Sequence, residues 1–203
     1  MSGGQGTRLG FDHPKGMFNI ELDSKYTLFE YFSRKLLRLM EITKRKHPDS
    51  KFSELNMIKW YIMTSDMNHE EIVGFFKDNK YFGYDPESIY FFPQGGIPAV
   101  DYNGKIMIES EGNLSLAPGG NGAMYVEMKN KGAIEHMKKH GVKYIYIAPV
   151  DNVLLKLADP TCVGFMVKNG FEIVSTYVKK AYPEEKIGVH VLNNGKVNVC
   201  EYS

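Results

Sequence analysis

The chain has 203 residues, of which 43% are hydrophobic and 24% charged, and these proportions are ordinary for a soluble globular protein. Its formal net charge of +1 lacks the basic excess that sequence-independent binding to nucleic acid requires, so we expect no nucleic-acid partner. Neither a long apolar run nor a signal-peptide pattern occurs, so we predict no membrane span and a cytoplasmic location. Cys162 and Cys200 fit no metal spacing and are expected to be free thiols.

Apolar spacing in the first half of the chain predicts helices that alternate with strands. The expected elements are a helix over 28–46, a buried strand over 56–65, a helix over 69–79 capped by Asn68, and an aromatic strand over 88–94. Asn103-Gly104 is typical of a hairpin turn, here between 100–102 and 105–108.

The second half begins with a predicted helix over 124–140, interrupted near Gly132 and stopped by Gly141. The elements expected after it are a strand over 143–150, a helix from Asp159-Pro160 to Gly170, and strands over 171–179, 187–192 and 196–202, the last two joined by Asn194-Gly195. Helices between early strands and hairpins at the end predict an α/β fold. Its sheet is expected to be mostly parallel, with an antiparallel portion near the C-terminus.

Residues 2–10, Ser-Gly-Gly-Gln-Gly-Thr-Arg-Leu-Gly, form a glycine-rich segment. Clustered glycines let backbone N–H groups approach phosphate oxygens, because no Cβ stands in the way. Arg8 adds a bidentate phosphate donor and Lys15 a point charge. The segment fits neither a P-loop nor a dinucleotide-binding fingerprint. A flexible glycine-rich terminus explains the composition equally well, so the residues alone leave both interpretations open.

Three further segments carry groups suited to a nucleotide. Gln94, at a predicted strand end, offers an acceptor and a donor to the edge of a base, and Gly120-Asn121-Gly122 permits close backbone contact with a ligand. Asp151 follows a predicted buried strand, where a carboxylate can hold Mg²⁺ together with substrate phosphates. Each has an ordinary alternative: a turn glutamine, a plain loop and a turn-capping aspartate. No nucleophile elbow and no metal-ligand spacing of histidines is present.

Together these segments resemble the eukaryotic UDP-N-acetylglucosamine pyrophosphorylases and, more widely, the UDP-sugar pyrophosphorylases. The signature of that family, Gly-Gly-x-Gly-Thr-Arg-Leu-Gly followed by Pro-Lys-Gly, stands here at 3–10 and 14–16. Later blocks agree in order and spacing, at 63–65, 94–95, 120–122, 150–152, 158–160, 180, 188–189 and 201–203. The resemblance covers the whole chain. It departs at Gly119, where the family usually has Asp, and at Ala123, where it usually has Gly.

The resemblance implies a single, partial nucleotidyltransferase catalytic domain over 1–203, with a three-layer αβα, mostly parallel sheet of the nucleotide-diphospho-sugar transferase (Rossmann-like) type. It implies catalytic roles for Arg8 and Lys15, and Mg²⁺ binding by Asp151. Contacts to the nucleotide are implied for Gly3, Gly4, Gln94, Gly120 and Asn121, and contacts to the sugar for Gly188 and Glu201.

The implied reaction is direct attack of N-acetylglucosamine 1-phosphate on the α-phosphorus of UTP, which forms UDP-N-acetylglucosamine and pyrophosphate. Two alternatives stay open: an inactive, truncated relic that still binds a nucleotide, and a related enzyme acting on glucose or galactose 1-phosphate. The family places a strand before the glycine-rich segment and a further domain after the last residue, so we expect this chain to be a piece of a longer enzyme. Its oligomeric state is not predicted.

Overall fold

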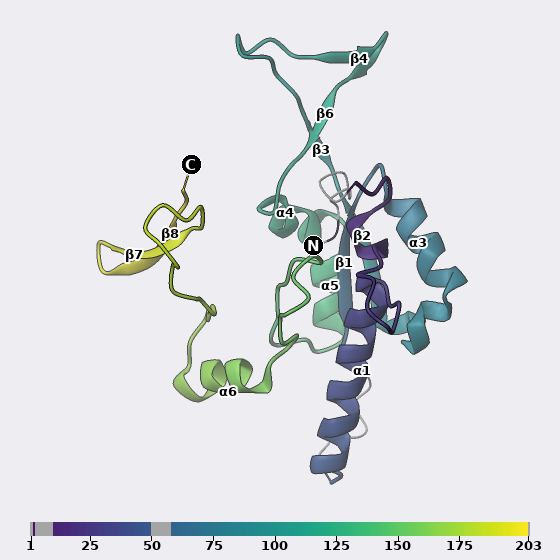
Figure 1. Ribbon diagram of the computed structural model, residues 1–203, viewed down its shortest axis with the longest axis vertical. Coiled ribbons are helices and arrows are strands. Elements are labelled where there is room, and N and C mark those ends of the chain that lie inside the picture. Colours follow the sequence, from purple (N-terminus) through teal and green to yellow (C-terminus); the bar gives the residue numbers. More distant parts are fainter. Residues whose placement is uncertain (1, 3–9, 50–57, 203) are drawn as a thin grey trace. The chain divides into compact units, whose positions relative to one another are not determined.

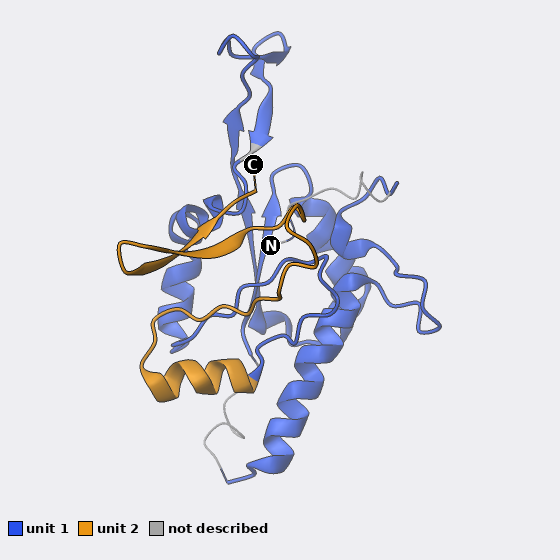
Figure 2. Cartoon of the chain, turned by 60° about the vertical axis from the view of Figure 1, so that its left-hand side comes forward, with its two compact units in different colours: residues 1–159 blue, residues 160–203 orange. Residues whose placement is uncertain are grey.

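A computed structural model describes residue 2, residues 10–49 and residues 58–202 of the chain. The chain forms two compact units, Met1–Asp159 and Pro160–Ser203, which Figure 2 colours separately and which are described here one at a time. None of the helices in the described ranges has both the length and the apolar character needed to cross a membrane.

The first unit contains both the helices and the parallel strands (Figure 1). Its elements are η2 (Lys15–Met17), α1 (Leu28–Lys46), β1 (Trp60–Ser65), α3 (His69–Asp78), η3 (Lys80–Gly83), η4 (Pro86–Ser88), β2 (Ile89–Gln94), β3 (Gly96–Pro98), β4 (Ile108–Ser110), β5 (Asn113–Leu114), β6 (Leu116–Pro118), α4 (Ala123–Asn130) and α5 (Ala133–Lys139). The second unit contains α6 (Pro160–Asn169), β7 (Val189–Asn193) and β8 (Lys196–Cys200).

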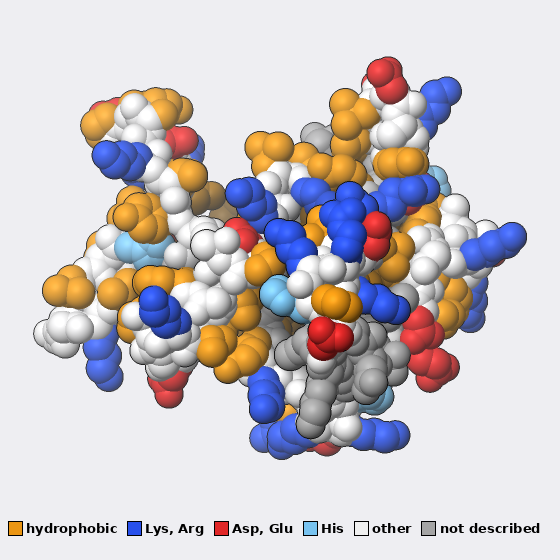
Figure 3. Space-filling view, turned by 90° about the horizontal axis from the view of Figure 1, so that it is seen from below, with side chains coloured by type: hydrophobic (Ala, Val, Ile, Leu, Met, Phe, Trp, Pro, Cys, Tyr) orange, Lys and Arg blue, Asp and Glu red, His pale blue; other side chains and the backbone are white. Residues whose placement is uncertain are grey.

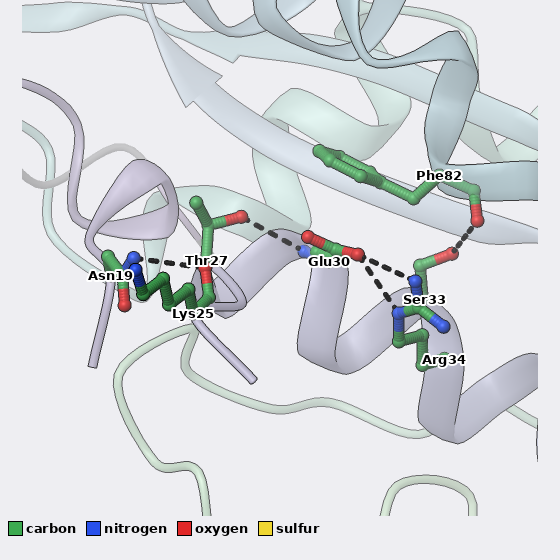
Figure 4. Close-up of polar contacts among 7 residues, drawn as sticks. All are labelled: Asn19, Lys25, Thr27, Glu30, Ser33, Arg34 and Phe82. Carbon is green, nitrogen blue, oxygen red and sulfur yellow. Dashed lines mark hydrogen bonds and ion pairs between the residues drawn. The ribbon is translucent and has the colours of Figure 1, made fainter. Parts of the chain in front are cut away.

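Helix α1 has the predicted bounds, and Figure 4 shows the polar contacts around its N-terminal part. Thr27 caps it by accepting a hydrogen bond from the Glu30 N–H at 3.3 Å, and Glu30 pairs with Arg34 one turn later at 2.8 Å. The Ser33 hydroxyl donates to the Phe82 carbonyl at 3.5 Å and so ties the helix to η3. The last turn is basic, which suits the negative end of the helix dipole.

Strands β1 and β2 form the centre of the first unit as a parallel pair, in register from Trp60↔Ile89 to Ser65↔Gln94. Side chains alternate between the two faces of this pair. Ile62 and Ile89 join a core cluster with α1 and α3, whereas Met63 joins a second cluster with α4 and α5. Figure 1 accordingly draws α1 and α3 on one side of the strands and α4 and α5 on the other. The α/β class is confirmed, with helices on both faces of the parallel pair.

The second core cluster ends in a polar group on α5. The Tyr61 hydroxyl lies 2.9 Å from His136 Nδ1, and the His136 ring stacks 4.1 Å from that of His140. Burial, assisted by the charges of His140 and Lys59, lowers the pKa of His136. The lowered pKa favours the neutral imidazole, whose unprotonated ring nitrogen can accept a hydrogen bond from the tyrosine hydroxyl.

A β arm leaves the carboxyl end of β2 and returns to α4. It consists of the antiparallel pairs β3–β6 and β4–β5, and Figures 1 and 2 show it extending away from the helices of the first unit. The turn predicted at Asn103-Gly104 is confirmed, with Gly104 at φ +80° and its N–H bonded to the Asp101 carbonyl. The flanking segments 100–102 and 105–108 pair through the Val100↔Ile106 bridge and the bond from the Asp101 N–H to the Lys105 carbonyl, but they form no continuous strands before β4.

The other helix boundaries were predicted closely. The helix predicted over 124–140 is present as α4 and α5, divided at Gly132, whose φ is +76°. Helix α3 follows Asn68 as expected, but the Asn68 side chain accepts from the Ser65 N–H instead of capping the helix. Helix α6 starts at Pro160 and is followed by Gly170 in a left-handed conformation.

Three strand predictions fail wholly or in part. No strand is assigned over 143–149 or 171–179, although the side chains there alternate or are β-branched and aromatic. Residues 50–57 lie outside the described ranges, and β1 begins only at Trp60. Alternation describes the spacing of side chains, whereas a strand also requires a continuous ladder of backbone hydrogen bonds with a neighbour.

The second unit has its hairpin where predicted. β7 and β8 pair antiparallel from Val189↔Cys200 to Asn193↔Lys196, and the connecting turn places Asn194 at φ 50° and Gly195 at φ 76°. This confirms the antiparallel portion near the C-terminus. Many of its apolar side chains are exposed, among them Leu192, Val197 and Val199, and Figure 3 shows apolar and basic side chains interspersed on the protein surface.

Candidate active site

The structure joins two predicted functional residues that lie 136 positions apart in the sequence. Lys15 Nζ donates a hydrogen bond to Asp151 Oδ2 at 2.9 Å. The lysine side chain is 23% exposed and that of the aspartate 48%, so both groups can be reached by a ligand from solvent. A cation beside an accessible carboxylate is suited to hold a phosphate and a metal ion next to each other.

Lys15 is placed by the packing of the residues on either side of it. Pro14 is fully buried, and the Phe18 N–H donates to the Lys15 carbonyl at 3.0 Å, which closes the η2 turn. Gly16 is buried against α1, and a Cβ built on it would lie 2.2 Å from two ring carbons of Phe29. Only glycine fits here, so the turn that carries Lys15 packs closely against the start of α1.

Asp151 is placed by a buried neighbour and a local turn. Val150 is 6% exposed and belongs to the core cluster shared by α1, α3 and the parallel strands. Asn152 Oδ1 accepts from the Leu154 N–H at 3.2 Å, a bond that turns the chain away immediately after the aspartate. The predicted strand before Asp151 is absent, yet its last residue is buried as a strand end would be.

Gln94 lies at the carboxyl edge of the parallel pair, where α/β sheets bind their ligands. It is the last residue of β2, it is 5% exposed, and it stands in register with Ser65, the last residue of β1. Within the described ranges, its Oε1 is the buried side-chain atom that lacks a hydrogen-bond partner. A buried acceptor without a donor costs about 1–3 kcal/mol, and a ligand N–H at this edge would remove that cost.

The loop of Gly120 and Asn121 returns to the end of β2 because β3 pairs with β6. A Cβ built on Gly119 would lie 3.7 Å from the Gly95 carbonyl oxygen, which places the two glycines side by side. Gly120 follows at φ +72°, and the Asn121 carbonyl accepts from the Met124 N–H in the first turn of α4. The structure therefore brings Gln94, Gly120 and Asn121 to one edge, as their predicted shared role requires.

The sequence analysis missed one residue that fixes this arrangement. Glu127 Oε1, on α4, accepts the Gly95 N–H at 3.3 Å and so ties the helix to the end of β2. A signal was available: Glu127 interrupts the buried side of the helix, between Met124 and Met128. A carboxylate on a buried helix face requires a donor, and here the donor is a backbone amide.

Gly188 and Glu201 lie together within the second unit. They flank the hairpin, directly before β7 and directly after β8, and Val189 pairs with Cys200 between them. A Cβ built on Gly188 would lie 3.3 Å from Glu201 Oε2. Ser175 and Tyr177 contact His190 on the same hairpin. The predicted sugar-binding pair therefore occupies one end of the hairpin.

Gly3, Gly4 and Arg8 lie outside the described residues, so their roles stay predictions. Ser2, which precedes them, is 3% exposed and donates both its N–H and its hydroxyl to the Met63 carbonyl of β1. The residue that leads into the glycine-rich segment is thus fixed to the central strand pair.

The donor set around Asp151 is compatible with Mg²⁺. In residues 2, 10–49 and 58–202, no three His, Cys, Asp or Glu side chains gather as a metal site. Mg²⁺ is commonly held by one or two carboxylates, water and substrate phosphates, and does not need a cage of protein ligands. The accessible Asp151 carboxylate is suited to this mode of Mg²⁺ coordination.

The family model described as UTP--glucose-1-phosphate uridylyltransferase matches residues 1–203. The chain belongs to this uridylyltransferase family. It is 40% identical over 205 residues to UDP-N-acetylglucosamine diphosphorylase 2 of Arabidopsis thaliana and 41% identical over 204 residues to UDP-N-acetylglucosamine pyrophosphorylase of Saccharomyces cerevisiae. Each comparison covers 100% of this chain and 41% of the relative, so the chain spans about two fifths of the length of these relatives.

Solved structures of the same uridylyltransferase family are also similar to this chain. A putative UDP-N-acetylglucosamine pyrophosphorylase from Entamoeba histolytica has a TM-score of 0.91 and 40% identity, covering 99% of this chain and 49% of that one. The Trypanosoma brucei enzyme in complex with an inhibitor has a TM-score of 0.91 and 34% identity, covering 100% of this chain and 40% of that one. The predicted resemblance is confirmed.

The two departures from the uridylyltransferase pattern face each other in space. A Cβ built on Gly119 would lie only 2.9 Å from Ala123 Cβ, closer than two such atoms approach in folded proteins. The methyl group at 123 fills the space that a side chain at 119 would occupy. Each departure is therefore compatible with the other.

Gly119→Ala is expected to destabilise the protein by about 1–3 kcal/mol, because the added methyl group overlaps that of Ala123. Ala123→Gly in the same chain should relieve the overlap, giving a coupling energy of about 1 kcal/mol in a double-mutant cycle measured by urea unfolding. Gly122→Ala is the control, since a Cβ there meets no atom within 4 Å. Additive effects of the two substitutions would show that these positions do not touch.

Proposed function

We propose that the chain is the nucleotide-binding part of a uridylyltransferase that forms UDP-N-acetylglucosamine and pyrophosphate from UTP and N-acetylglucosamine 1-phosphate. The observation that carries this proposal is the 2.9 Å contact between Lys15 and Asp151. It unites the two residues to which the sequence assigned phosphate and metal binding. The names of the relatives from Arabidopsis thaliana and Saccharomyces cerevisiae support the choice of sugar.

The chemistry is direct displacement at the α-phosphorus of UTP by an oxygen of the sugar phosphate. That nucleophile is already ionised, so the site needs positive charge and correct placement and no general base. Lys15, together with Arg8, neutralises the triphosphate and the leaving pyrophosphate. Asp151 is the residue that would hold Mg²⁺, and bound Mg²⁺ supplies charge neutralisation between phosphate groups.

Recognition of uracil is assigned to the edge formed by Gln94 and Gly120. The buried Gln94 Oε1 is available to accept the N3–H of the base, and Gly120 leaves room because it has no side chain. The Asn121 side chain is exposed beside it and can donate to the nucleotide sugar. The backbone amides of Gly3 and Gly4 complete the proposed nucleotide site.

The sugar of the product is assigned to the end of the hairpin in the second unit. The Glu201 carboxylate can accept hydrogen bonds from sugar hydroxyls, and Gly188 leaves the neighbouring space free of a side chain. Measuring turnover with N-acetylglucosamine, glucose and galactose 1-phosphates separates the proposed substrate from the alternative sugars.

The proposal extends to fold and location. We infer that β1 and β2 belong to a wider, mostly parallel sheet of the Rossmann-like type in a single catalytic domain, because helices already cover both of their faces. The free cysteines Cys162 and Cys200 suit a reducing compartment such as the cytoplasm.

Gln94→Leu tests the assignment of the base. The substitution is expected to raise KM for UTP about tenfold or more, because the acceptor for N3–H is lost. Stability should be unchanged or higher, since leucine removes a buried oxygen that has no partner among residues 2, 10–49 and 58–202. The measurement is pyrophosphate release with UTP and with CTP, which lacks an N3–H, alongside thermal unfolding.

The preference of the wild-type protein for UTP over CTP should shrink in Gln94→Leu. An unchanged preference would remove Gln94 from the base site. Calorimetry with UTP and UDP-N-acetylglucosamine addresses the remaining alternative, because binding without any pyrophosphate release would identify a relic.

A further inference from the structure

Lys35, on the solvent-facing flank of α1, makes contacts that neither the reaction nor helix stability explains. Its Nζ donates to the Val153 carbonyl at 2.6 Å and to the Leu155 carbonyl at 2.9 Å, and it lies 4.4 Å from the centre of the Tyr31 ring. Both bonds are partly buried, and both end on the segment that begins with Asp151. One ammonium group therefore holds the carbonyls of residues 153 and 155, shortly after the proposed metal-binding carboxylate.

Two local hydrogen bonds shape the segment after Asp151. The Leu155 N–H donates to the Asn152 carbonyl at 3.3 Å, and the Leu154 N–H donates to Asn152 Oδ1 at 3.2 Å. Val153 packs on the core cluster, but no helix or strand runs through 151–159. Leu157 also packs on the core cluster, and Lys35 adds two hydrogen bonds that join this segment to α1.

The same helix also positions Lys15. Gly16 packs on Phe29 near the start of α1, and Lys35 lies six residues further along it. The separation of the Lys15 ammonium and the Asp151 carboxylate is thus set by two attachments to one rigid element. Catalysis of phosphoryl transfer depends largely on the placement of charged groups. These two attachments to α1 are therefore expected to affect the rate.

We propose that Lys35 is a positioning residue for the reaction, which holds the Asp151 segment at its working distance from Lys15. It acts through the backbone of 153–155 and touches neither substrate. The expected effect of Lys35 on the rate rests on the proposed function. Its effect on the order of the segment follows from the hydrogen bonds alone.

The test compares Lys35→Met, which keeps the aliphatic chain and removes the donors, with Lys35→Arg, which keeps donors and charge. Hydrogen exchange of the amides of 152–157 should become at least tenfold faster in Lys35→Met and should return toward the wild-type rate in Lys35→Arg. The Mg²⁺ concentration that gives half-maximal rate should rise severalfold in Lys35→Met. Arg38→Met is the matched control, because Arg38 lies on the same helix and pairs only with Glu41 among the described residues.

Unchanged exchange of 152–157 in Lys35→Met would overturn the inference. So would a variant with faster exchange whose kcat and Mg²⁺ dependence match the wild type, since Lys35 would then be only structural. A wild-type chain that releases no pyrophosphate would instead refute the proposed function, and the exchange measurement would still decide whether Lys35 holds the segment.

Discussion

Lys15→Met is expected to lower kcat for UDP-N-acetylglucosamine formation about a hundredfold. The substitution keeps most of the length of the side chain and removes the positive charge that the structure places on Asp151 Oδ2. Loss of a single preorganised charged donor at such a site typically costs about that factor, or roughly 2.7 kcal/mol of transition-state stabilisation. Initial rates of pyrophosphate release at saturating UTP give the comparison.

The stability of Lys15→Met distinguishes a chemical role from a structural one. A pair whose members are 23% and 48% exposed is screened by water and contributes less than about 1 kcal/mol to folding. The unfolding midpoint should therefore change little while the rate falls. Lys77→Met, at an exposed lysine in the last turn of α3, is the control and should alter neither quantity. A Lys15→Met variant that keeps the wild-type rate would exclude Lys15 from the reaction.

The helices were predictable because their information is local. The apolar spacing of 28–46 and the glycines at 132, 141 and 170 determine where helices run and stop, and each of these glycines adopts a positive φ. The strands were less predictable. Residues 143–149 alternate as a strand would, but alternation does not say whether a neighbour completes the backbone ladder.

Site residues could be named from sequence, but their contacts could not. The resemblance pointed to Lys15 and Asp151 separately, and nothing in either segment says that they touch across 136 positions. The same holds for Gly119 and Ala123, which looked like two independent departures until the 2.9 Å approach was seen. The first contact depends on how η2 and the segment after Val150 pack on α1, and the second on the turn that precedes α4, so neither can be read from one residue alone.

Helix α1 connects these observations, because it joins the core to both halves of the proposed phosphate site. Phe29 and Phe32 are buried in the core. Phe29 also contacts Gly16, and Lys35 on the same helix holds the segment after Asp151. A change in the packing of α1 should therefore affect the site without touching any group that contacts substrate. The contact of Gly16 with Phe29 is the most sensitive point at which to test this.

Gly16→Ala is expected to destabilise the protein by about 3 kcal/mol, the upper part of the range for overpacked cores. The added Cβ would lie 2.2 Å from two ring carbons of Phe29, which is 1% exposed and stacks at 4.9 Å on Phe76. Because the ring is buried and packs against Phe76, we expect the η2 turn to shift and to carry Lys15 with it. Urea unfolding and kcat, measured on the same preparation, should both fall.

Gly74→Ala is a control in which the free energy of unfolding is expected to change in the opposite direction. Gly74 lies inside α3, a Cβ there meets no atom within 4 Å, and alanine in a helix interior is favoured over glycine by about 1 kcal/mol. The same chemical change should thus stabilise the protein at 74 and destabilise it at 16. Phe29→Leu in the Gly16→Ala background should recover part of kcat by making room for the methyl group. A Gly16→Ala variant as stable and active as the wild type would show that η2 does not need its close contact with α1 to place Lys15.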